Sequence, residues 1–304
     1  MEKYRILRDK VSISSCFVRL AVPEPASPGQ LALAHCPHYI ERVQTGALSN
    51  GEQRDIGFPW SDRMVERSKR SVGATVAAVR SALQHGASVN LAGGTHHAKR
   101  DKGGGFCVFN DLAVAARVYQ TDGIARLNSG APRSSSANIG TKVLVIDLDV
   151  HQGDGTAAIL ESDASVFTFS MHGEKNYPFN KEKSDLDIEL PDGTGDVEYL
   201  RQLEKSLIHI EQCFKPDLVL YVAGLDVHHA DRLGKLALSD EGIVLRDQMV
   251  LSWAQQFDLP VAAVMAGGYF PDLDHLTDLQ LGVVERLASY GKNYQSSSKT
   301  TLNR

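Results

Sequence analysis

The stretch Val143-Leu144-Val145-Ile146-Asp147-Leu148-Asp149-Val150-His151 predicts a buried β-strand that ends in three polar side chains. Successive side chains of an extended chain point to opposite faces, so Asp147, Asp149 and His151 share one face, which could bind a cation. The segment Gly153-Asp154-Gly155 then predicts a turn into a helix that begins at Thr156. The polar cluster would therefore lie at the carboxyl end of a strand, where open α/β sheets place their functional sites.

The same residues allow three other interpretations. They could be solvated loop carboxylates beside a histidine without a role, because loops at strand ends are commonly polar. Gly153-x-Gly155-x-x-Ala158 matches a dinucleotide-binding fingerprint, although a phosphate there would face the nearby aspartates. An apolar strand that ends in Asp-x-Asp is also typical of phosphatases that phosphorylate an aspartate and use magnesium.

A second segment supplies histidines suited to proton transfer. The predicted strand 87–91 runs into Ala92-Gly93-Gly94-Thr95-His96-His97, and three consecutive glycines follow at 103–105. Histidine titrates near neutral pH, so two adjacent imidazoles with separate partners could do two jobs at one reacting centre. An isolated His-His pair is more often a surface pair. Its position after a strand and near a glycine-rich turn favours a role in a site.

Two further strand ends follow the same pattern. The predicted strand 217–222 leads through a glycine to Asp226, and the predicted strand 259–265 leads through two glycines to Tyr269. Taken separately, Asp226 could be a turn residue and Tyr269 a half-buried aromatic. Four glycine-marked strand ends that carry His-His, Asp-x-Asp-x-His, Asp and Tyr indicate one shared site.

Together these motifs resemble the zinc-dependent histone deacetylase superfamily and occur in the family's order. The segments that carry the resemblance are Gly94-Thr95-His96-His97, Gly105-Phe106-Cys107, Asp147 to Gly155, Gly224-Leu225-Asp226 and Gly267-Gly268-Tyr269. Asp231-Arg232-Leu233-Gly234, followed by Gly242 to Asp247, is similar to the class IV and related bacterial branch. The resemblance extends over residues 1–290, which we expect to form one deacetylase-like catalytic domain.

The resemblance implies a metal site with three protein ligands, Asp149, His151 and Asp226, and a water in the open position. It implies zinc as the ion, with iron(II) as the alternative. Two carboxylate ligands would nearly cancel the charge of the metal and make it a weaker acidifier of water than a site with three neutral histidines. The reaction would therefore need help from a general base.

The resemblance assigns that base to His97, with electrostatic and hydrogen-bond support from His96. Asp147 would contact His96 and Asp154 would contact His97, which would orient each ring and raise its basicity. Tyr269 would donate its hydroxyl to the substrate carbonyl and share the stabilisation of the tetrahedral oxyanion.

A potassium site is also implied by the resemblance. Its ligands would be the Asp147 carboxylate, the Ser170 hydroxyl and the backbone oxygens of Asp149, His151 and Met171.

The family's substrate lies in a narrow apolar tunnel that holds the stem of an acyl-lysine. By resemblance, Gly105 and Phe106 form one wall of this tunnel. The opposite wall falls in residues 171–179, where either Tyr177 or Phe179 could line the opening, so the preference for acyl-chain length stays open.

The composition agrees with a large α/β domain. A chain of 304 residues with 42% hydrophobic content can bury one such core. Helical periodicity alternates with the apolar strands, which predicts a parallel sheet covered by helices in three layers. The resemblance implies eight strands, as in arginase. The predicted helices are 64–83, 111–119, 197–214, 240–256 and 273–287.

Three segments are expected to depart from this core. Residues 121–141 look like a flexible polar insertion before the metal strand, and residues 291–304 like a disordered tail. Members of the family usually carry another strand and a short loop upstream of the segment like Met1 to Arg5. The chain is therefore expected to begin inside the family's pattern, without an edge strand and part of the site rim.

Charge and cysteine content restrict partners and location. A net charge of −5 gives no nucleic-acid signature, so contact with chromatin would run through a partner or a protein tail. The basic cluster Lys99, Arg100 and Lys102 is expected to be a solvated loop. Four scattered cysteines, no signal peptide and no apolar run of about 18 residues predict a cytoplasmic or nuclear protein without membrane contact. Nothing in the sequence indicates an oligomeric state.

These interpretations together predict a metal-dependent hydrolase that removes acetyl or longer acyl groups from lysine side chains of histones or other proteins. The nearest alternative is the same chemistry on a small amide such as an acetylated polyamine. An inactive homologue that binds acyl-lysine without cleaving it is an alternative of another class, and the joint presence of His97, Asp149, His151, Asp226 and Tyr269 speaks against it. The phosphatase interpretation would leave His96, His97 and Tyr269 without a role.

Overall fold

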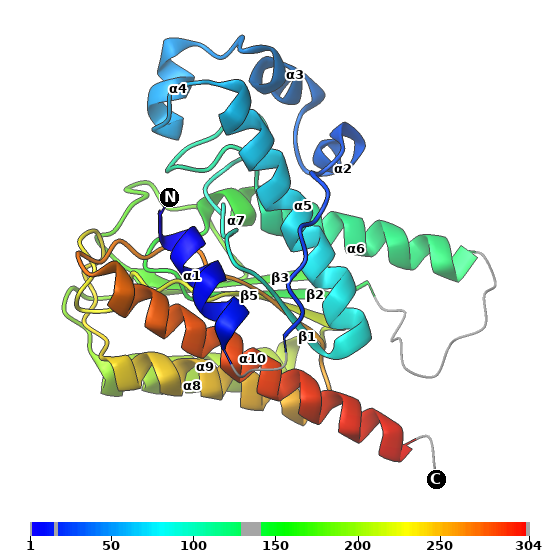
Figure 1. Cartoon of the computed structure of the whole chain (residues 1–304), viewed down its shortest axis with the longest axis vertical. Coiled ribbons are helices and arrows are strands. Elements are labelled where there is room, and N and C mark those ends of the chain that lie inside the picture. Colours follow the sequence, from blue (N-terminus) through cyan, green and yellow to red (C-terminus); the bar gives the residue numbers. More distant parts are fainter. Residues whose placement is uncertain (1, 15–17, 129–140, 302–304) are drawn as a thin grey trace.

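A parallel sheet of six strands forms the centre of this computed structural model, which describes residues 2–14, 18–128 and 141–301. The strand order is β1-β6-β5-β2-β3-β4, and all neighbouring strands are parallel. Helices cover both faces of the sheet (Figure 1), which confirms the three-layer α/β architecture. The strands are β1 (Ala87–Asn90), β2 (Val143–Asp147), β3 (Val166–Gly173), β4 (Leu186–Leu190), β5 (Leu218–Val222) and β6 (Val261–Val264).

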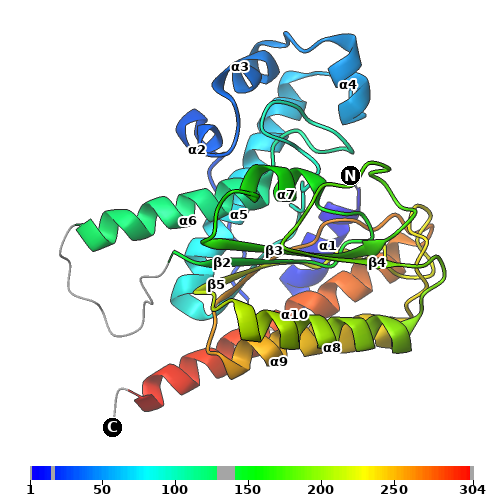
Figure 2. The ribbon, with the colours of Figure 1, turned by 180° about the vertical axis from the view of Figure 1, so that it is seen from behind.

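Two groups of helices sandwich the sheet, as Figure 2 shows. One face carries α5 (Asp62–His85), α6 (Asp111–Asn128) and α7 (Asp154–Leu160). The other carries α8 (Asp196–Cys213), α9 (Asp240–Gln256) and α10 (Leu273–Thr301).

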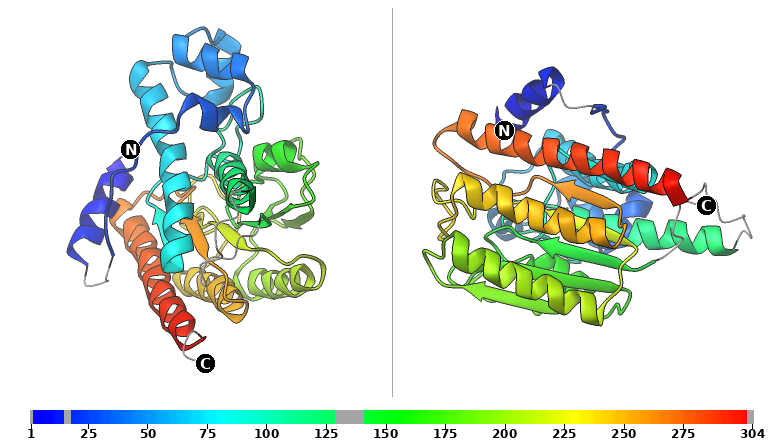
Figure 3. Two further views of the ribbon diagram at one scale, coloured as in Figure 1. Left: turned by 90° about the vertical axis from the view of Figure 1, so that its right-hand side faces the viewer. Right: turned by 90° about the horizontal axis from the view of Figure 1, so that it is seen from below.

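The N-terminal part of the chain adds four more helices. Helix α1 (Glu2–Ile13) packs along α10 on the outside of the second layer (Figure 3). Three short helices then project beside the start of α5 (Figure 1). They are α2 (Pro28–Ala32), α3 (Pro37–Thr45) and α4 (Asn50–Ile56).

The alternation of side chains along β2 explains the two helical layers. Val143 and Val145 belong to the hydrophobic cluster formed with α5 and α6, whereas Leu144 and Ile146 belong to the cluster formed with α8, α9 and α10. All four side chains are buried. A strand that is apolar on both faces has to lie in the middle of a covered parallel sheet, and β2 does.

The predicted strands and helices are present, with ends that differ by a few residues. The described residues form six strands rather than the eight implied by the resemblance. Strands β3 and β4 were not predicted from the sequence. Strand β3 carries polar Thr168, Ser170 and His172, and β4 alternates leucine or isoleucine with Asp187 and Glu189, so neither is a continuous apolar run.

The expected polar insertion is partly helical. Helix α6 continues through residues 121–128, whereas residues 129–140 lie outside the described part of the chain. On α6, Asp122 pairs with Arg80 of α5 at 3.0 Å, and Gly123 is buried. Contact with α5 therefore extends the helix beyond the apolar pattern that predicted it.

The expected disordered tail is helical over residues 291–301, which belong to α10. Tyr290 and Tyr294 stack with their ring centroids 6.3 Å apart. A Cβ atom at Gly86 would lie 2.4 Å from Tyr294, so that glycine gives the ring room between α5 and β1. This tertiary contact anchors the helix at Tyr294, and residues 302–304 lie outside the described range.

None of the helices within the described ranges is long and apolar enough to cross a membrane.

A buried charge network joins the sheet to α9 and α10. The Asp247 carboxylate accepts hydrogen bonds from Arg246 Nη2 at 2.8 Å, from the Tyr221 hydroxyl at 2.6 Å and from Arg286 Nη2 at 2.7 Å. Burial alone would raise the pKa of Asp247, but Arg246, Arg286 and Tyr221 lower it below its ordinary value. Arg246 Nη1 also donates to the carbonyl of Gly224, in the loop that leads to Asp226.

We predict that Asp247→Asn lowers the free energy of unfolding by about 3 kcal/mol or more, because it leaves the buried Arg246 without its counter-charge. Urea denaturation at neutral pH measures this change. Asp122→Asn is the matched control, since Asp122 and Arg80 form an exposed pair whose loss should cost no more than about 1 kcal/mol. Equal effects of the two substitutions would contradict the importance of the buried network.

Candidate metal centre and active site

The parallel sheet brings the predicted site residues to one edge. His96 and His97 follow β1, Asp149 and His151 follow β2, Asp226 follows β5 and Tyr269 follows β6. These four strands are neighbours in the order β1-β6-β5-β2, so their carboxyl ends lie side by side.

Asp149, His151 and Asp226 form a group whose ligand atoms all lie within 4.8 Å of one another and could hold a metal ion. His151 Nδ1 lies 3.0 Å from Asp149 Oδ1 and 3.2 Å from Asp226 Oδ2. Both carboxylates are buried, with relative exposures of 2% for Asp149 and 0% for Asp226. Two carboxylates and one imidazole suit a divalent ion such as zinc or iron(II).

Backbone amides orient the two carboxylates. Gly267 N donates to Asp149 Oδ2 at 2.9 Å, and Val150 N donates to Asp226 Oδ1 at 2.9 Å. A Cβ atom at position 267 would lie 1.9 Å from Asp226 Oδ2, so only glycine allows the backbone after β6 to approach this closely. Each carboxylate thus keeps its other oxygen turned toward His151.

The electrostatics of this group favour a cation. Burial and the adjacent charge of Asp149 raise the pKa of Asp226 to about 7. Burial disfavours a charged His151, but Asp149 and Asp226 outweigh it and raise the pKa of His151 to about 10. A bound divalent ion would replace the proton as the positive charge that these two buried carboxylates need.

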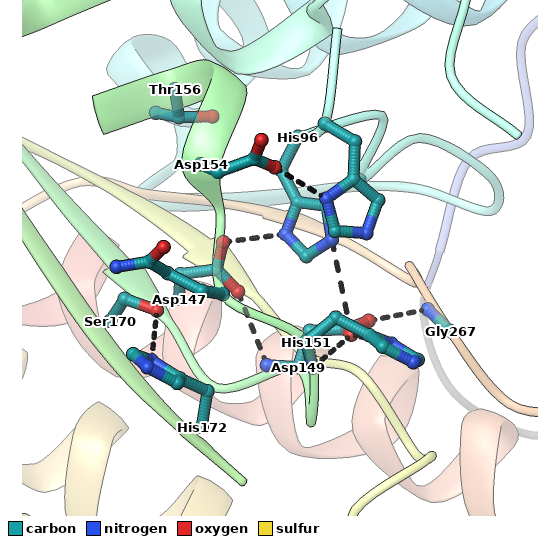
Figure 4. Close-up of polar contacts among 12 residues, drawn as sticks. His96, Asp147, Asp149, His151, Asp154, Thr156, Ser170, His172 and Gly267 are labelled. Atoms are coloured by element: carbon teal, nitrogen blue, oxygen red, sulfur yellow. Dashed lines mark hydrogen bonds and ion pairs between the residues drawn. The ribbon is translucent and has the colours of Figure 1, made fainter. Parts of the chain in front are cut away.

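Two histidine–aspartate pairs face this group, as expected from the motifs. His96 Nδ1 lies 2.7 Å from Asp147 Oδ2 (Figure 4), and His97 Nδ1 lies 2.7 Å from Asp154 Oδ1. All four side chains are buried. The Nε2 atom of His96 lies 3.9 Å from Asp149 Oδ1, which connects the pairs to the metal-binding group.

The pKa values of His96 and His97 are shifted in opposite directions. Burial disfavours the charged form of His96, but Asp147 and Asp149 outweigh burial and raise its pKa to about 9. Burial and the positive charge of His96 lower the pKa of His97 to about 4, although Asp154 opposes the shift. At neutral pH, His97 is therefore neutral and can accept a proton, whereas His96 is a cation.

Tyr269 and Phe106 lie at the opening of the site. Their ring centroids are 6.4 Å apart, and their relative exposures are 43% and 48%. Phe106 has a backbone φ of 65°, which is uncommon for a residue with a side chain. Burial, then Tyr4 and the carboxylates of Asp149 and Asp226, raise the pKa of Tyr269, so its hydroxyl stays protonated at neutral pH.

Tyr177 rather than Phe179 lies against the catalytic candidates. The Tyr177 ring packs edge-on against His97, with centroids 4.9 Å apart. Phe179 packs on the outer side of Tyr177, at 6.3 Å, and is 84% exposed. Gly105 lies against the rings of His97 and Tyr177, because a Cβ atom there would be 2.5 Å from His97 Cδ2 and 3.0 Å from Tyr177 Cε1.

Lys99 differs from the solvated cation expected in the basic cluster. Its side chain is 22% exposed, and its Nζ atom lies 3.4 Å from Asp154 Oδ2 and close to the Glu182 carboxylate. The position of Lys99, two residues after His97, is the only sequence feature that points to its contact with Asp154. Nothing in the sequence indicated its other partner, Glu182, which is 83 residues away.

Two residues of the implied potassium site, Asp147 of β2 and Ser170 of β3, lie side by side in the sheet. Asp147 and Ser170 are register partners, and both are 2% exposed. Met171 follows on β3 and is fully buried. The Ser170 hydroxyl lies 2.9 Å from His172 Nδ1, a contact that the sequence did not indicate (Figure 4).

A second group, His228, Asp240 and His275, also brings potential ligand atoms together. The polar atoms of this group are paired with one another by hydrogen bonds and need no ion. Ala230 N donates to His228 Nδ1 at 3.1 Å. The neutral imidazole then carries its proton on Nε2, which lies 2.9 Å from Asp240 Oδ1. His275 Nε2 lies 2.9 Å from the same oxygen. We describe this group as a hydrogen-bonded clamp between α9 and α10.

A sequence model of the histone deacetylase domain matches residues 2–278. The chain belongs to the histone deacetylase family. This finding confirms the resemblance carried by the motifs. Family membership supports a hydrolase of the deacetylase type that uses a divalent metal.

Relatives in this family come from bacteria, archaea and plants. An uncharacterized protein from Picosynechococcus sp. is 42% identical over 278 residues, or 91% of this chain and 88% of that protein. Histone deacetylase 2 from Arabidopsis thaliana is 31% identical, over 82% of this chain and 63% of that protein. A probable deacetylase from Methanothermobacter thermautotrophicus is 28% identical, over 88% of this chain and 79% of that protein.

Solved structures of family members share the fold. The crystal structure of a histone deacetylase homologue from Aquifex aeolicus has a TM-score of 0.73, with 24% identity over 97% of this chain and 82% of that chain. The HD domain of HDA15 also has a TM-score of 0.73, at 21% identity. These likenesses confirm the deacetylase-like fold expected from the motifs.

We predict that Asp226→Asn weakens binding of Zn²⁺ by at least about 100-fold, since loss of a residue that merely orients a ligand already costs roughly 10- to 100-fold. Competition with a chromophoric chelator measures the affinity of the metal-free protein. Asp240→Asn is the matched control, because Asp240 belongs to the hydrogen-bonded clamp. Loss of Zn²⁺ binding in the Asp240 variant, with binding kept in the Asp226 variant, would contradict the assignment and place the ion at His228, Asp240 and His275.

Proposed function

We propose that this chain is a metal-dependent deacylase that removes acetyl or longer acyl groups from lysine side chains of proteins. The observation that carries the proposal is that two histidine–aspartate pairs and a group of two carboxylates and one imidazole meet at one sheet edge. A metal-binding group of three residues would by itself be compatible with many hydrolases. Beside it, the two histidine–aspartate pairs supply imidazoles suited to the proton transfers of amide hydrolysis.

In this proposal, Asp149, His151 and Asp226 hold the ion and the other residues handle protons. A divalent ion at this position would act as a Lewis acid on the substrate carbonyl and lower the pKa of water. Zinc fits the donor set, and iron(II) is the alternative.

His97 is the proposed general base and acid. Its Nδ1 atom is held by Asp154, so Nε2 is free to take a proton from the attacking water and later to deliver it to the leaving amine. The low pKa of His97 in the protein without an ion keeps this nitrogen unprotonated at neutral pH. His96, held by Asp147, contributes its positive charge beside the developing negative charge.

Tyr269 is the proposed oxyanion donor. A protonated hydroxyl at the opening can donate a hydrogen bond to the carbonyl oxygen, and this bond strengthens as the oxygen becomes negative. Because burial and nearby carboxylates raise the pKa of Tyr269, the proton remains on the phenol throughout the usual pH range.

The surroundings of the opening favour an acyl-lysine on a protein over a small cationic amide. Phe106, Tyr177 and Phe179 supply apolar surface for a lysine stem and its neighbours. The nearby Glu182 carboxylate is paired with Lys99, and the Asp231 carboxylate accepts backbone amides. Because both of these carboxylates already have partners, neither is free to bind the ammonium groups of a polyamine.

A structural potassium ion is proposed at Asp147 and Ser170. The Asp147 carboxylate, the Ser170 hydroxyl and backbone oxygens of Asp149, His151 and Met171 are hard oxygen donors suited to an alkali cation. Bound there, the ion would offset the negative charge of the buried Asp147 beside His96.

We expect the purified protein to release acyl groups from acyl-lysine peptides, to lose this activity after chelation, and to regain it when Zn²⁺ is restored. The assay should compare acetyl and longer acyl peptides with an acetylated polyamine at equal concentration. Activity that survives complete removal of the metal would sink the mechanism. Faster turnover of the polyamine than of every peptide would favour the alternative substrate class.

Two substitutions test the proton-handling roles. Tyr269→Phe and His97→Ala should each lower kcat by roughly 100-fold or more, because they remove an oxyanion donor and a general base. Metal content, measured by elemental analysis, should stay as in the unaltered protein. Turnover at the original rate in either variant would remove the role assigned to that residue. Binding of the peptide by the unaltered protein without any turnover would instead support an acyl-lysine-binding module.

A further inference from the structure

The motif Asp231-Arg232-Leu233-Gly234 forms a tight turn that reaches from the metal-ligand loop to Tyr269. The Asp231 carboxylate accepts three backbone amides: Oδ1 from Leu233 N at 2.7 Å and from Gly234 N at 2.9 Å, and Oδ2 from Tyr269 N at 2.6 Å. Hydrogen bonds to an ionised carboxylate are shorter and stronger than those between neutral groups. One side chain therefore closes its own turn and fixes the backbone of Tyr269.

The turn is also anchored to the segment that carries Asp226. A Cβ atom at Gly234 would lie 1.7 Å from the carbonyl oxygen of Asp226, so the two backbones are in direct contact at this glycine. Asp226 and Tyr269 are thus joined through Asp231 and Gly234, although they follow different strands.

Lys3 of α1 holds the same segment from the other side. Its Nζ atom donates to the carbonyls of Ala266 at 3.3 Å and Gly268 at 3.1 Å, and it lies 5.2 Å from the centroid of the Tyr269 ring. The Lys3 side chain is buried, with 8% relative exposure. Its charge is therefore directed at the backbone immediately before Tyr269.

The segment that Lys3 contacts, residues 266–268, contains a strained residue. Ala266 has a φ of 48°, in the left-handed region that residues with a side chain rarely adopt. Such a conformation persists only where the surroundings hold it in place. Because the Tyr269 side chain is 43% exposed, packing alone fixes its ring less firmly than a buried ring would be fixed.

We propose that Asp231 is a positioning residue for Tyr269, and that Lys3 is the second arm of the same brace. Asp231 holds the amide of Tyr269, and Lys3 holds the two carbonyls before it, so the phenol hydroxyl stays at a fixed place relative to the Asp149–His151–Asp226 group. This inference rests on the proposed function, because Tyr269 is assigned there as the oxyanion donor. The brace would act on turnover rather than on metal binding.

The test is a double-mutant cycle between Asp231 and Tyr269, read out as kcat and KM for an acyl-lysine peptide. We expect Asp231→Ala to lower kcat roughly 10- to 100-fold, as a misplaced catalytic group does, with metal content unchanged. In the Tyr269→Phe background the same substitution should lower kcat less than about twofold, since there is no hydroxyl left to position. Lys3→Met should show the same dependence on Tyr269 with a smaller loss.

Asp231→Asn keeps the size of the side chain and serves if the alanine variant does not fold. Its single carbonyl oxygen can accept from the turn or from Tyr269 N, but an amide NH2 cannot accept. Asp272→Asn is the matched control. Asp272 accepts Asp274 N at 2.9 Å and His275 N at 3.1 Å at the start of α10, so its loss affects a neighbouring loop without contacting Tyr269.

Hydrogen exchange of the Tyr269 amide, followed by NMR, gives a second readout that does not depend on catalysis. We expect this amide to exchange at least about tenfold faster in the Asp231→Asn variant than in the unaltered protein or the Asp272 control. Unchanged exchange, or losses in kcat that multiply independently in the two backgrounds, would overturn the brace. If the unaltered protein hydrolyses no acyl-lysine peptide, the proposed function fails, whereas the exchange measurement still decides whether Asp231 holds Tyr269.

Discussion

The site depends on the need to compensate the charge of two buried carboxylates that contact the same imidazole. Asp149 and Asp226 lie out of contact with solvent, where unpaired negative charge is costly. Amides of Gly267 and Val150, together with His151, compensate part of this charge. The uncompensated part raises the pKa of Asp226, which agrees with a cation bound between these ligand atoms.

The fold makes this convergence possible through the parallel order of four adjacent strands. Strands β1, β6, β5 and β2 end at the same edge, and each is followed by a glycine-containing loop or a turn that carries one part of the site. Two hydrophobic clusters, one on each face, hold the strands rigid. The loops can then be polar and locally strained, as at Phe106 and Ala266, because the sheet and its helices supply the stability.

Much of the fold could be predicted because its signals are local. The run 143–146 is apolar on both faces, and amphipathic periodicity revealed α5, α8 and the first part of α10. Strands β3 and β4 were missed because Ser170, His172 and Asp187 interrupt their apolar pattern for reasons that arise only near the site. The helical residues 291–301 were missed because the contact between Tyr294 and Gly86 joins distant parts of the chain.

By itself, the sequence indicated the candidate residues of the site: Asp149 and His151 are two apart directly after an apolar strand, and His96 and His97 follow another strand. The resemblance also implied that Asp147 contacts His96, but nothing in the sequence indicated the contacts of Lys99 with Glu182 and of Asp231 with Tyr269, which span 83 and 38 residues. Tyr177 was chosen over Phe179 in the same way, by its contact with His97. Side-chain periodicity is a property of a few consecutive residues, whereas such pairings exist only after the strands and loops have packed, so the tertiary structure alone decided them.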